Sequence, residues 1–259
     1  MSAETLAARA EDAGLNAAAP REQRWLDGWL VRYSPGKAKR ARCINAVAEG
    51  RLALDERIAL AAAVYRDAGL PMFVRITPYT QPPSLDADLA ARGWASLDDT
   101  RVMLAPALAP ELVHEAEAPA PDGFTWNRLA AEDFAEAIGE LRGSPASQRI
   151  AQAQRLAGSP VPYSALALVR QADGAIVACG QVAVEAEFAG LYDVFSAPAA
   201  RGQGHASRLC RRLLGLAMGQ GARVGYLQVE ADNLPARAIY RRLGFADAFA
   251  YHYRQAPGV

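Results

Sequence analysis

The feature that most constrains the fold of this chain is a glycine-rich turn that joins a strand to a helix. The segment from Val194 to Gln220 reads VFSAPAARGQGHASRLCRRLLGLAMGQ, and Gly202 and Gly204 precede an apolar run at helical spacing. A helix begins with several backbone N–H groups that have no partner inside the helix and with roughly half a positive charge. The turn is therefore a candidate anion site, which glycine lets a ligand approach closely because it has no Cβ.

The composition is that of a globular protein without net charge. The 259 residues are 51% hydrophobic, and 28 Lys and Arg balance 28 Asp and Glu. A chain of this length can form one large domain or two of ordinary size. Because this balance gives no overall field to attract nucleic acid or an anionic membrane, we expect neither as a partner. No stretch approaches the roughly 20 apolar residues of a membrane span, and the N-terminus lacks the apolar core of a signal peptide, so we expect a cytoplasmic protein.

The cysteines and histidines are too scattered to indicate a disulfide framework or a metal site. No two cysteines form a Cys-x-x-Cys pair, and the histidines lack ligand spacing. They lie at Cys43, Cys179 and Cys210 and at His114, His205 and His252. We therefore expect the cysteines to be small core residues and no metal to be bound.

The pattern of apolar residues divides the chain into two halves. Residues 106–122 contain four prolines, which break any regular element and predict a linker between residues 1–105 and 123–259. In the first half we expect a short helix or a mobile leader over residues 1–20, closed by Pro20, and a hairpin of strands at 29–33 and 41–47. A helix from Leu54 to just before Gly69, a strand at 72–76, a helix at 85–92 and a strand at 94–104 follow. In the second half we expect strands at 124–128, 163–169, 176–184, 188–195, 224–230 and 246–254 and helices at 131–141, 148–156, 205–219 and 235–243.

The two halves end in similar segments. LDADLAARGWASLDDTRVML ends the first half and aligns with LPARAIYRRLGFADAFAYHY in the second, so that Gly93-Trp94 matches Gly244-Phe245. This recurrent order of strand, helix, Gly-aromatic and strand predicts two copies of one supersecondary unit, with chance similarity between Ala-rich helix ends as the alternative. The first copy lacks the paired glycines and has Leu89 where the second has Tyr240. A single active site, in the second half, is the consequence.

Two other phosphate-binding motifs do not fit the turn. A Walker A loop needs Lys and then Ser or Thr after its last glycine, whereas Gly204 is followed by His205 and Ala206. A dinucleotide fingerprint needs a third glycine, where this chain has Ser207, and an acidic residue about 20 residues further on. No strand pattern here supplies that acid.

The turn and the residues after it resemble a known family. Arg201-x-x-Gly204-x-Ala206 fits the pattern (Gln/Arg)-x-x-Gly-x-(Gly/Ala) of the GNAT superfamily, the acetyl-CoA-dependent N-acetyltransferases. The other elements of the family's pattern occur in the same order and spacing at Pro198, Glu230, Asn233, Tyr240 and Leu243-Gly244-Phe245. The resemblance covers about residues 124–254, and the first half looks like a degenerate copy. It implies an α/β (α+β) protein of two GNAT-like domains, each a mixed, mostly antiparallel sheet flanked by helices.

The resemblance also implies where acetyl-CoA binds. Backbone N–H groups of the turn would hold the pyrophosphate, and the preceding strand end would offer its unpaired backbone to the pantetheine arm. An amide at Val194 or its neighbour would stabilise the oxyanion of the reaction. The implied coenzyme contacts are Val194, Phe195, Ser196, Arg201, Gly202, Gln203, Gly204, His205, Ala206, Ser207 and Asn233. As bare sequence features, Arg201 is equally a solvated loop arginine and Asn233 equally the N-cap of the next helix.

Two residues are candidates for proton transfer. Tyr240 matches the family's tyrosine acid, with packing against Phe245 as its alternative role. Related enzymes often have a glutamate where this chain has Gln228, so Glu230, on the same strand face, is the candidate base. Further candidate bases are Glu185, Glu187 and Asp193.

The sequence therefore predicts an N-acetyltransferase. An acetyl group would move from acetyl-CoA to a primary amine by direct attack through a tetrahedral intermediate. The acceptor pocket is expected around residues 141–162, with a contribution from the first half. The alternatives are a non-catalytic acyl-CoA-binding sensor or regulatory protein, and a first half that recruits a macromolecular partner.

Overall fold

The computed structural model describes residues 2–257, and their strands form one eleven-stranded sheet in the order β1-β2-β3-β4-β11-β5-β10-β9-β8-β7-β6. The strands are β1 (Gln23–Leu26), β2 (Trp29–Arg32), β3 (Ile44–Ala46), β4 (Phe73–Ile76), β5 (Ala95–Ala105), β6 (Phe124–Leu129), β7 (Tyr163–Arg170), β8 (Ile176–Glu185), β9 (Phe188–Ser196), β10 (Val224–Glu230) and β11 (Ala246–Gln255). The α-helices are α1 (Ala3–Ala17), α2 (Leu54–Asp67), α3 (Leu85–Ala91), α4 (Ala131–Arg142), α5 (Ala146–Ala157), α6 (His205–Gly219) and α7 (Leu234–Arg242). Short 3₁₀ helices are η1 (Lys39–Ala41), η2 (Pro110–Ala116) and η3 (Pro198–Ala200).

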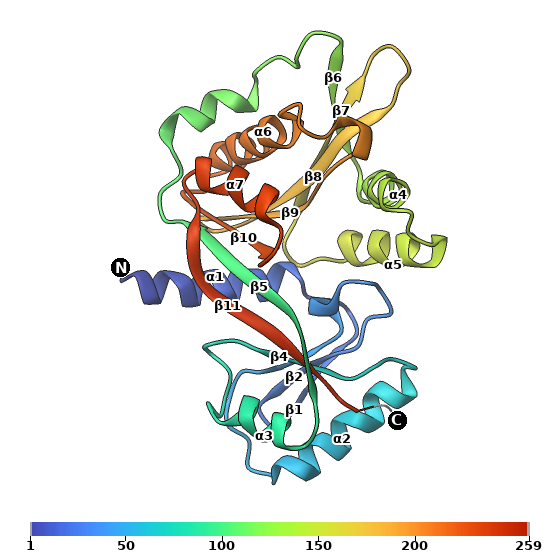
Figure 1. Cartoon of the computed structure of the whole chain (residues 1–259), viewed down its shortest axis with the longest axis vertical. Coiled ribbons are helices and arrows are strands. Elements are labelled where there is room, and N and C mark those ends of the chain that lie inside the picture. The colour runs from blue at the N-terminus through green and yellow to red at the C-terminus, as the bar shows by residue number, and fades with distance from the viewer. Residues whose placement is uncertain (1, 258–259) are drawn as a thin grey trace.

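The expected helices and strands are present, with bounds that differ by at most a few residues. Strand β1 was not expected, and it pairs with β2 around the Asp27-Gly28 turn. Both turn residues have positive φ, 41° and 85°, as a tight two-residue hairpin requires. Figure 1 shows the second half above the first along the long axis of the molecule, with α1 lying across the junction.

The two halves exchange their last strands. Strand β5 ends the first half in sequence but pairs with β10, while β11 ends the second half and pairs with β4. The two exchanged strands also pair with each other in the middle of the sheet. We expected a sheet in each half, and the halves instead form one sheet, because β5 and β11 are long enough to reach from one half into the other (Figure 1).

The helices that precede the exchanged strands end in the same way. The backbone N–H of Trp94 donates to the carbonyl of Leu89, and that of Phe245 donates to the carbonyl of Tyr240, each at 3.1 Å. The intervening glycines, Gly93 and Gly244, have φ values of 79° and 87°. This is a C-terminal cap that glycine favours because it tolerates positive φ. Leu89 and Tyr240 thus occupy equivalent positions in two structurally related units.

The proline-rich segment is more ordered than its sequence predicts. We expect no regular element between residues 106 and 122, yet Pro110 begins η2, because proline at the first turn of a helix removes no hydrogen bond. Leu112 of η2 is buried in the core of the second half. The Arg211 guanidinium on α6 donates to Glu115 at 2.8 Å, so this segment packs along α6. Gly215 permits this contact, since a Cβ there would lie 2.4 Å from the Leu112 carbonyl oxygen.

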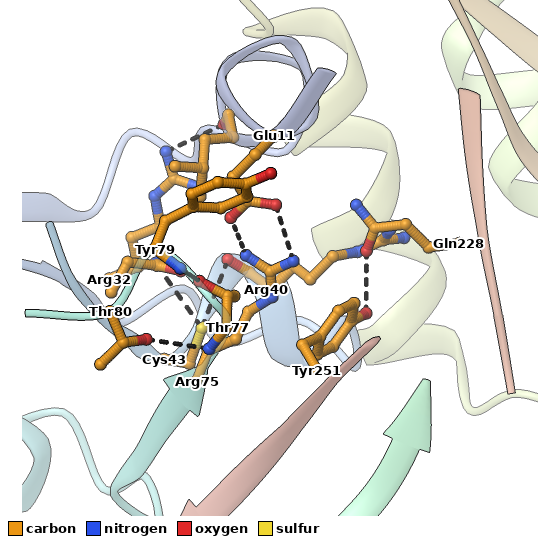
Figure 2. A network of polar contacts seen from close by, with 12 residues as sticks. Glu11, Arg32, Arg40, Cys43, Arg75, Thr77, Tyr79, Thr80, Gln228 and Tyr251 are labelled. Atoms are coloured by element: carbon orange, nitrogen blue, oxygen red, sulfur yellow. Dashed lines mark hydrogen bonds and ion pairs between the residues drawn. The ribbon is translucent and has the colours of Figure 1, made fainter. Parts of the chain in front are cut away.

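Helix α1 ties the two halves together. Its apolar face, which includes Leu6, Ala10 and Ala13, packs in one cluster with Phe188 and Tyr226 of the second half. On its other side Glu11 forms a buried ion pair with Arg75 of β4, drawn in Figure 2. The first helix in sequence is therefore part of the junction between the halves.

Candidate functional site

Strands β9 and β10 separate half-way along their length. They pair in parallel from Phe188 with Val224 to Leu191 with Leu227 and no further. Beyond that point β10 continues against β5, and residues 192–196 of β9 continue against β8 alone. A register shift falls between these residues and β8, and Asp193 there has a φ of 51°. One backbone edge of β9 from Tyr192 to Ser196 is therefore without a strand partner, as the resemblance implies for the pantetheine arm.

The glycine-rich turn presents an unpaired row of backbone donors. Gly202 and Gly204 both have a φ of 78°, and Gly204 is the N-cap residue of α6 with no side-chain cap. Within the described chain, the N–H groups of residues 202–207 have no hydrogen-bond acceptor, and the first bond of the helix runs from Arg208 to Gly204 at 3.1 Å. Leu209 and Leu213 anchor α6 in the core. The loop is thus held rigidly with its donors free, which suits a phosphate.

A cavity of about 600 Å³ opens between this turn, the end of β9 and α7. It brings together most of the residues that the sequence assigned to the coenzyme, namely Val194, Phe195, Ser196, Arg201, Gly202, Gly204, His205, Ala206, Ser207 and Asn233, as well as Tyr240. Gln203 and Glu230 do not line it. The Gln203 side chain instead lies against Ala199 and His205.

Three of these side chains also have structural roles. The His205 ring is buried against Phe124, and burial followed by the nearby Arg208 charge lowers its pKa, so His205 offers the cavity its backbone rather than a charge. Asn233 is the N-cap of α7, accepting from the Ala236 N–H at 3.3 Å, while lining the cavity. Arg201 is exposed with its guanidinium 5.7 Å from the Phe195 ring centroid.

Tyr240 is buried and faces the same cavity. Its ring packs edge-on against Phe245, and 8% of the residue is exposed. None of the residues that the structure describes hydrogen-bonds to its hydroxyl. Burial, followed by the nearby Cys210, raises the pKa of the phenol, so the hydroxyl stays protonated at neutral pH. Tyr240 therefore packs in the core and lines the cavity with a protonated phenol.

A second cavity, of about 480 Å³, lies at the junction of the halves. Its walls come from residues 36–42 of the first half, from α4 and α5 in the range 142–155, and from β9, β10 and β11. The two cavities share no lining residue among those described, but consecutive residues of β9 line them, Asp193 the second and Val194 the first. The sequence predicted an acceptor pocket in this region.

The candidate bases are distributed unevenly around these cavities. Glu230 is exposed and lines the second cavity, together with Gln228, which accepts a hydrogen bond from the Tyr251 hydroxyl at 2.8 Å. Asp193 lines it too. Glu185 and Glu187 line neither cavity and are engaged by α1, Glu185 with Asn16 at 2.8 Å and Glu187 with Arg9 at 2.6 Å.

The Asp193 carboxylate is heavily hydrogen-bonded. It accepts from Arg142 at 2.8 Å, Gln181 at 3.0 Å and Gln152 at 3.2 Å. Burial alone would raise its pKa, but the charge and hydrogen bond of Arg142, followed by Arg155 and Arg40, hold the pKa below its usual value. A carboxylate stabilised in this way is a poor proton acceptor. Glu230 is the better candidate.

Among residues 2–257 there is no group of three His, Cys, Asp or Glu side chains that could hold a metal ion, and the three cysteines are free and buried. No described helix is long and apolar enough to cross a membrane.

The sequence matches the protein family described as "Probable histone acetyltransferase Rv0428c C-terminal" over residues 7–254. The chain belongs to this family. The match includes both halves, so the Rv0428c C-terminal family unit comprises the exchanged sheet and not the second half alone.

Individual relatives agree with the family. The chain is 25% identical over 235 residues to the "Uncharacterized N-acetyltransferase YobR" of Bacillus subtilis, covering 90% of this chain and 91% of that protein. A GCN5-related N-acetyltransferase from Kribbella flavida has the same fold, with a TM-score of 0.62 and 18% identity over 98% of this chain and 96% of that one. A tandem GNAT protein from the clavulanic acid biosynthesis pathway aligns with a TM-score of 0.61 and 17% identity over 79% of this chain and 70% of that one. The chain is thus an acetyltransferase of the GNAT type with two GNAT-like units.

Several lining residues were not anticipated from the sequence. Ala236 and Ile239 of α7 line the first cavity with Tyr240. Ala236 lies four residues before Tyr240 and therefore on the same helix face, which was a usable signal. Arg40, Arg142 and Arg155 line the second cavity; Arg142 and Arg155 fall within the expected range 141–162 and Arg40 in the first half, but the sequence singled out none of them. They come from η1, α4 and α5, and no local pattern could place them together.

Proposed function

We propose that this member of the Rv0428c C-terminal family moves an acetyl group from acetyl-CoA to a primary amine, with the amine bound in the cavity between the two halves. The observation that carries the proposal is the separation of β9 and β10. Beyond the separation, consecutive residues of β9 line the two cavities. Val194 lines the first, which we call the coenzyme cavity, and Asp193 lines the second, which we call the junction cavity. An acyl donor in one cavity and an acceptor in the other would meet there.

The residues of the first cavity suit coenzyme A. The free N–H groups of residues 202–207 at the start of α6 would hold its pyrophosphate. The unpaired edge of β9 would take the amide groups of the pantetheine arm by adding hydrogen bonds as a neighbouring strand does. An N–H near Val194 would then donate to the thioester oxygen as negative charge develops on it.

The acceptor must lose a proton to react. A primary amine with a pKa near 10.4 is only about one part in a thousand neutral at pH 7. Glu230, at the wall of the junction cavity, would take that proton directly or through water. The neutral amine then attacks the carbonyl carbon, forming the C–N bond and a tetrahedral intermediate.

The intermediate collapses by breaking the C–S bond. Tyr240, protonated and facing the coenzyme cavity, would give its proton to the departing sulfur. The nitrogen, which is still cationic after the attack, loses its second proton, and the Tyr240 phenolate recovers that proton directly or through water. The products are the acetylated amine and the free thiol of coenzyme A. No metal takes part in this scheme.

The test is an amine screen on the full chain. Acetyl-CoA is combined with panels of small amines and peptides, with thiol release and the mass of the acetylated product as independent readouts. The proposal expects at least one amine class to release thiol in equal amount to acetylated product. Tight binding of acetyl-CoA without transfer to any amine would favour a non-catalytic acyl-CoA sensor.

A further inference from the structure

The junction cavity has an excess of positive charge. Its walls carry six cationic side chains against the carboxylates of Asp98, Asp193 and Glu230, although the whole chain is neutral. The cations are Lys37, Lys39, Arg40, Arg42, Arg142 and Arg155. Two of them are neutralised, because Lys39 pairs with Asp98 and Arg142 pairs with Asp193. The excess is thus a local property of this cavity.

Arg40 and Arg155 have no carboxylate partner within residues 2–257. No ion pair of either guanidinium lies within the 4.0 Å that defines a salt bridge. Both are partly buried, and Figure 2 shows Arg40 beside the Gln228 and Tyr251 pair. The Arg40 guanidinium lies 5.4 Å from the Tyr192 ring centroid, and Arg155 lines the same cavity as Tyr163.

These two arginines line the same cavity from different elements, Arg40 from η1 of the first half and Arg155 from α5 of the second. Because Asp98 and Asp193 already pair with Lys39 and Arg142, Glu230 is the one lining carboxylate left, and it forms an ion pair with neither arginine within the described residues. Partial burial makes such an arrangement costly unless an anion completes it.

The coenzyme does not account for this excess. Its phosphates have their own donors at residues 202–207, and those residues line the other cavity. The cationic cavity is the one that the proposed function gives to the acceptor. Guanidinium groups bind carboxylate and phosphate oxygens through paired hydrogen bonds, whereas a cationic peptide would meet like charge.

We infer that the acceptor is an amine that also carries an oxyanion, a carboxylate or a phosphate, and that Arg40 and Arg155 together bind this group. The inference rests on the proposed function for the identity of the cavity as the acceptor site. Arg40 and Arg155 would hold the anion, and the amine would extend from it along the cavity towards the β9 edge. Since Arg40 belongs to the first half, that half then contributes directly to substrate choice.

The first experiment measures anion binding without catalysis. The melting temperature of the full chain is recorded with succinate, inorganic phosphate and neutral succinamide, each with and without saturating coenzyme A to occupy the phosphate-binding turn. Arg40→Gln, Arg155→Gln and the double variant are compared with Arg66→Gln, which removes an exposed arginine from α2. We expect succinate or phosphate to stabilise the wild type and Arg66→Gln, and the double variant to lose that shift with its response to coenzyme A intact. Equal shifts in all variants, or none in the wild type, would overturn the inference.

The second experiment uses matched amines. Phosphoethanolamine is compared with ethanolamine, and β-alanine with β-alaninamide, by thiol release from acetyl-CoA, with a lysine-rich peptide as a third class. The anionic member of a pair should have a kcat/KM about tenfold or more higher, and Arg40→Gln and Arg155→Gln should remove this preference through KM with little change in kcat. A preference within the phosphoethanolamine pair indicates that the site binds phosphate, and a preference within the β-alanine pair indicates that it binds carboxylate. Equal use of neutral and anionic amines, or preference for the basic peptide, would overturn the inference. If no amine reacts, the proposed function fails, and the melting experiment still decides whether the cavity binds anions.

Discussion

The carboxylate of Glu11 on α1 accepts hydrogen bonds from both terminal nitrogens of Arg75 on β4, and the two side chains are 8% and 2% exposed (Figure 2). The Arg75 guanidinium also lies 3.9 Å from the ring centroid of Tyr251 on β11. Arg75 thus connects α1, its own strand β4 and the exchanged strand β11 of the second half.

Removing Glu11 should therefore destabilise the whole chain. We expect Glu11→Ala to lower the free energy of unfolding by about 3–5 kcal/mol, because Arg75 would remain as a buried charge without a partner. Glu4→Ala, at an exposed position of the same helix, should cost well under about 1 kcal/mol. Urea denaturation measures both. Equal losses for the two variants would show that the ion pair does not hold the junction.

Replacing Gly202 should weaken acetyl-CoA binding more than it lowers the free energy of unfolding. A Cβ at Gly202 would meet no atom of the chain, and the same holds for Gly174 in the β7–β8 turn, with φ values of 78° and 71°. Alanine at either position should cost a similar strain of about 1–2 kcal/mol. Only Gly202→Ala places a methyl group where the phosphates would approach, so it should raise the Kd for acetyl-CoA by about tenfold or more. Calorimetric titration of both variants measures this, and an unchanged Kd for Gly202→Ala would place the coenzyme elsewhere.

The contribution of Asp193 to the free energy of unfolding should decrease at acid pH. Burial alone would raise its pKa, but Arg142 and the other arginines lower it in the folded chain. The contribution is therefore fully present above the unfolded value of about 3.9 and is lost as pH falls through the lower folded value. We expect the difference in unfolding free energy between the wild type and Asp193→Asn to be constant from about pH 5 to 8 and to shrink below about pH 4.

Urea denaturation at a series of pH values measures this difference. Asp232→Asn, at an exposed position before α7, serves as the control and should differ little from the wild type throughout. A difference for Asp193→Asn that grows on acidification would mean that the arginines do not stabilise the charged carboxylate.

The glycine-rich turn before α6 could be predicted from the sequence because its determinants are local. Gly204 at positive φ, the apolar face of α6 and the spacing to Tyr240 all lie within one stretch of chain. The relation between the halves was also visible, since the Gly-aromatic pairs at 93–94 and 244–245 mark the same helix cap.

The exchange of strands could not be predicted in this way. The alternating residues of β5 and β11 identify strands but not their partners, which are set by long-range pairing. Strand β1 was missed because its residues are mostly exposed, Trp25 to 67%, although the Asp27-Gly28 turn was a usable signal. The presence of Arg40 and Arg155 in the wall of one cavity is likewise a result of the fold alone.

We propose that Tyr240 protonates the departing sulfur of a coenzyme held by the α6 turn. The most direct test of this proposal is the single-turnover rate constant of thiol release by Tyr240→Phe, with the best amine of the screen and saturating acetyl-CoA. Tyr65→Phe, which removes a buried hydroxyl bonded to the Arg32 carbonyl in the first half, is the matched control. The account expects Tyr240→Phe to be slower by about 100-fold, with acetyl-CoA bound as tightly as before and Tyr65→Phe unaffected in rate. An unchanged rate constant in Tyr240→Phe, with the coenzyme site intact, would contradict it.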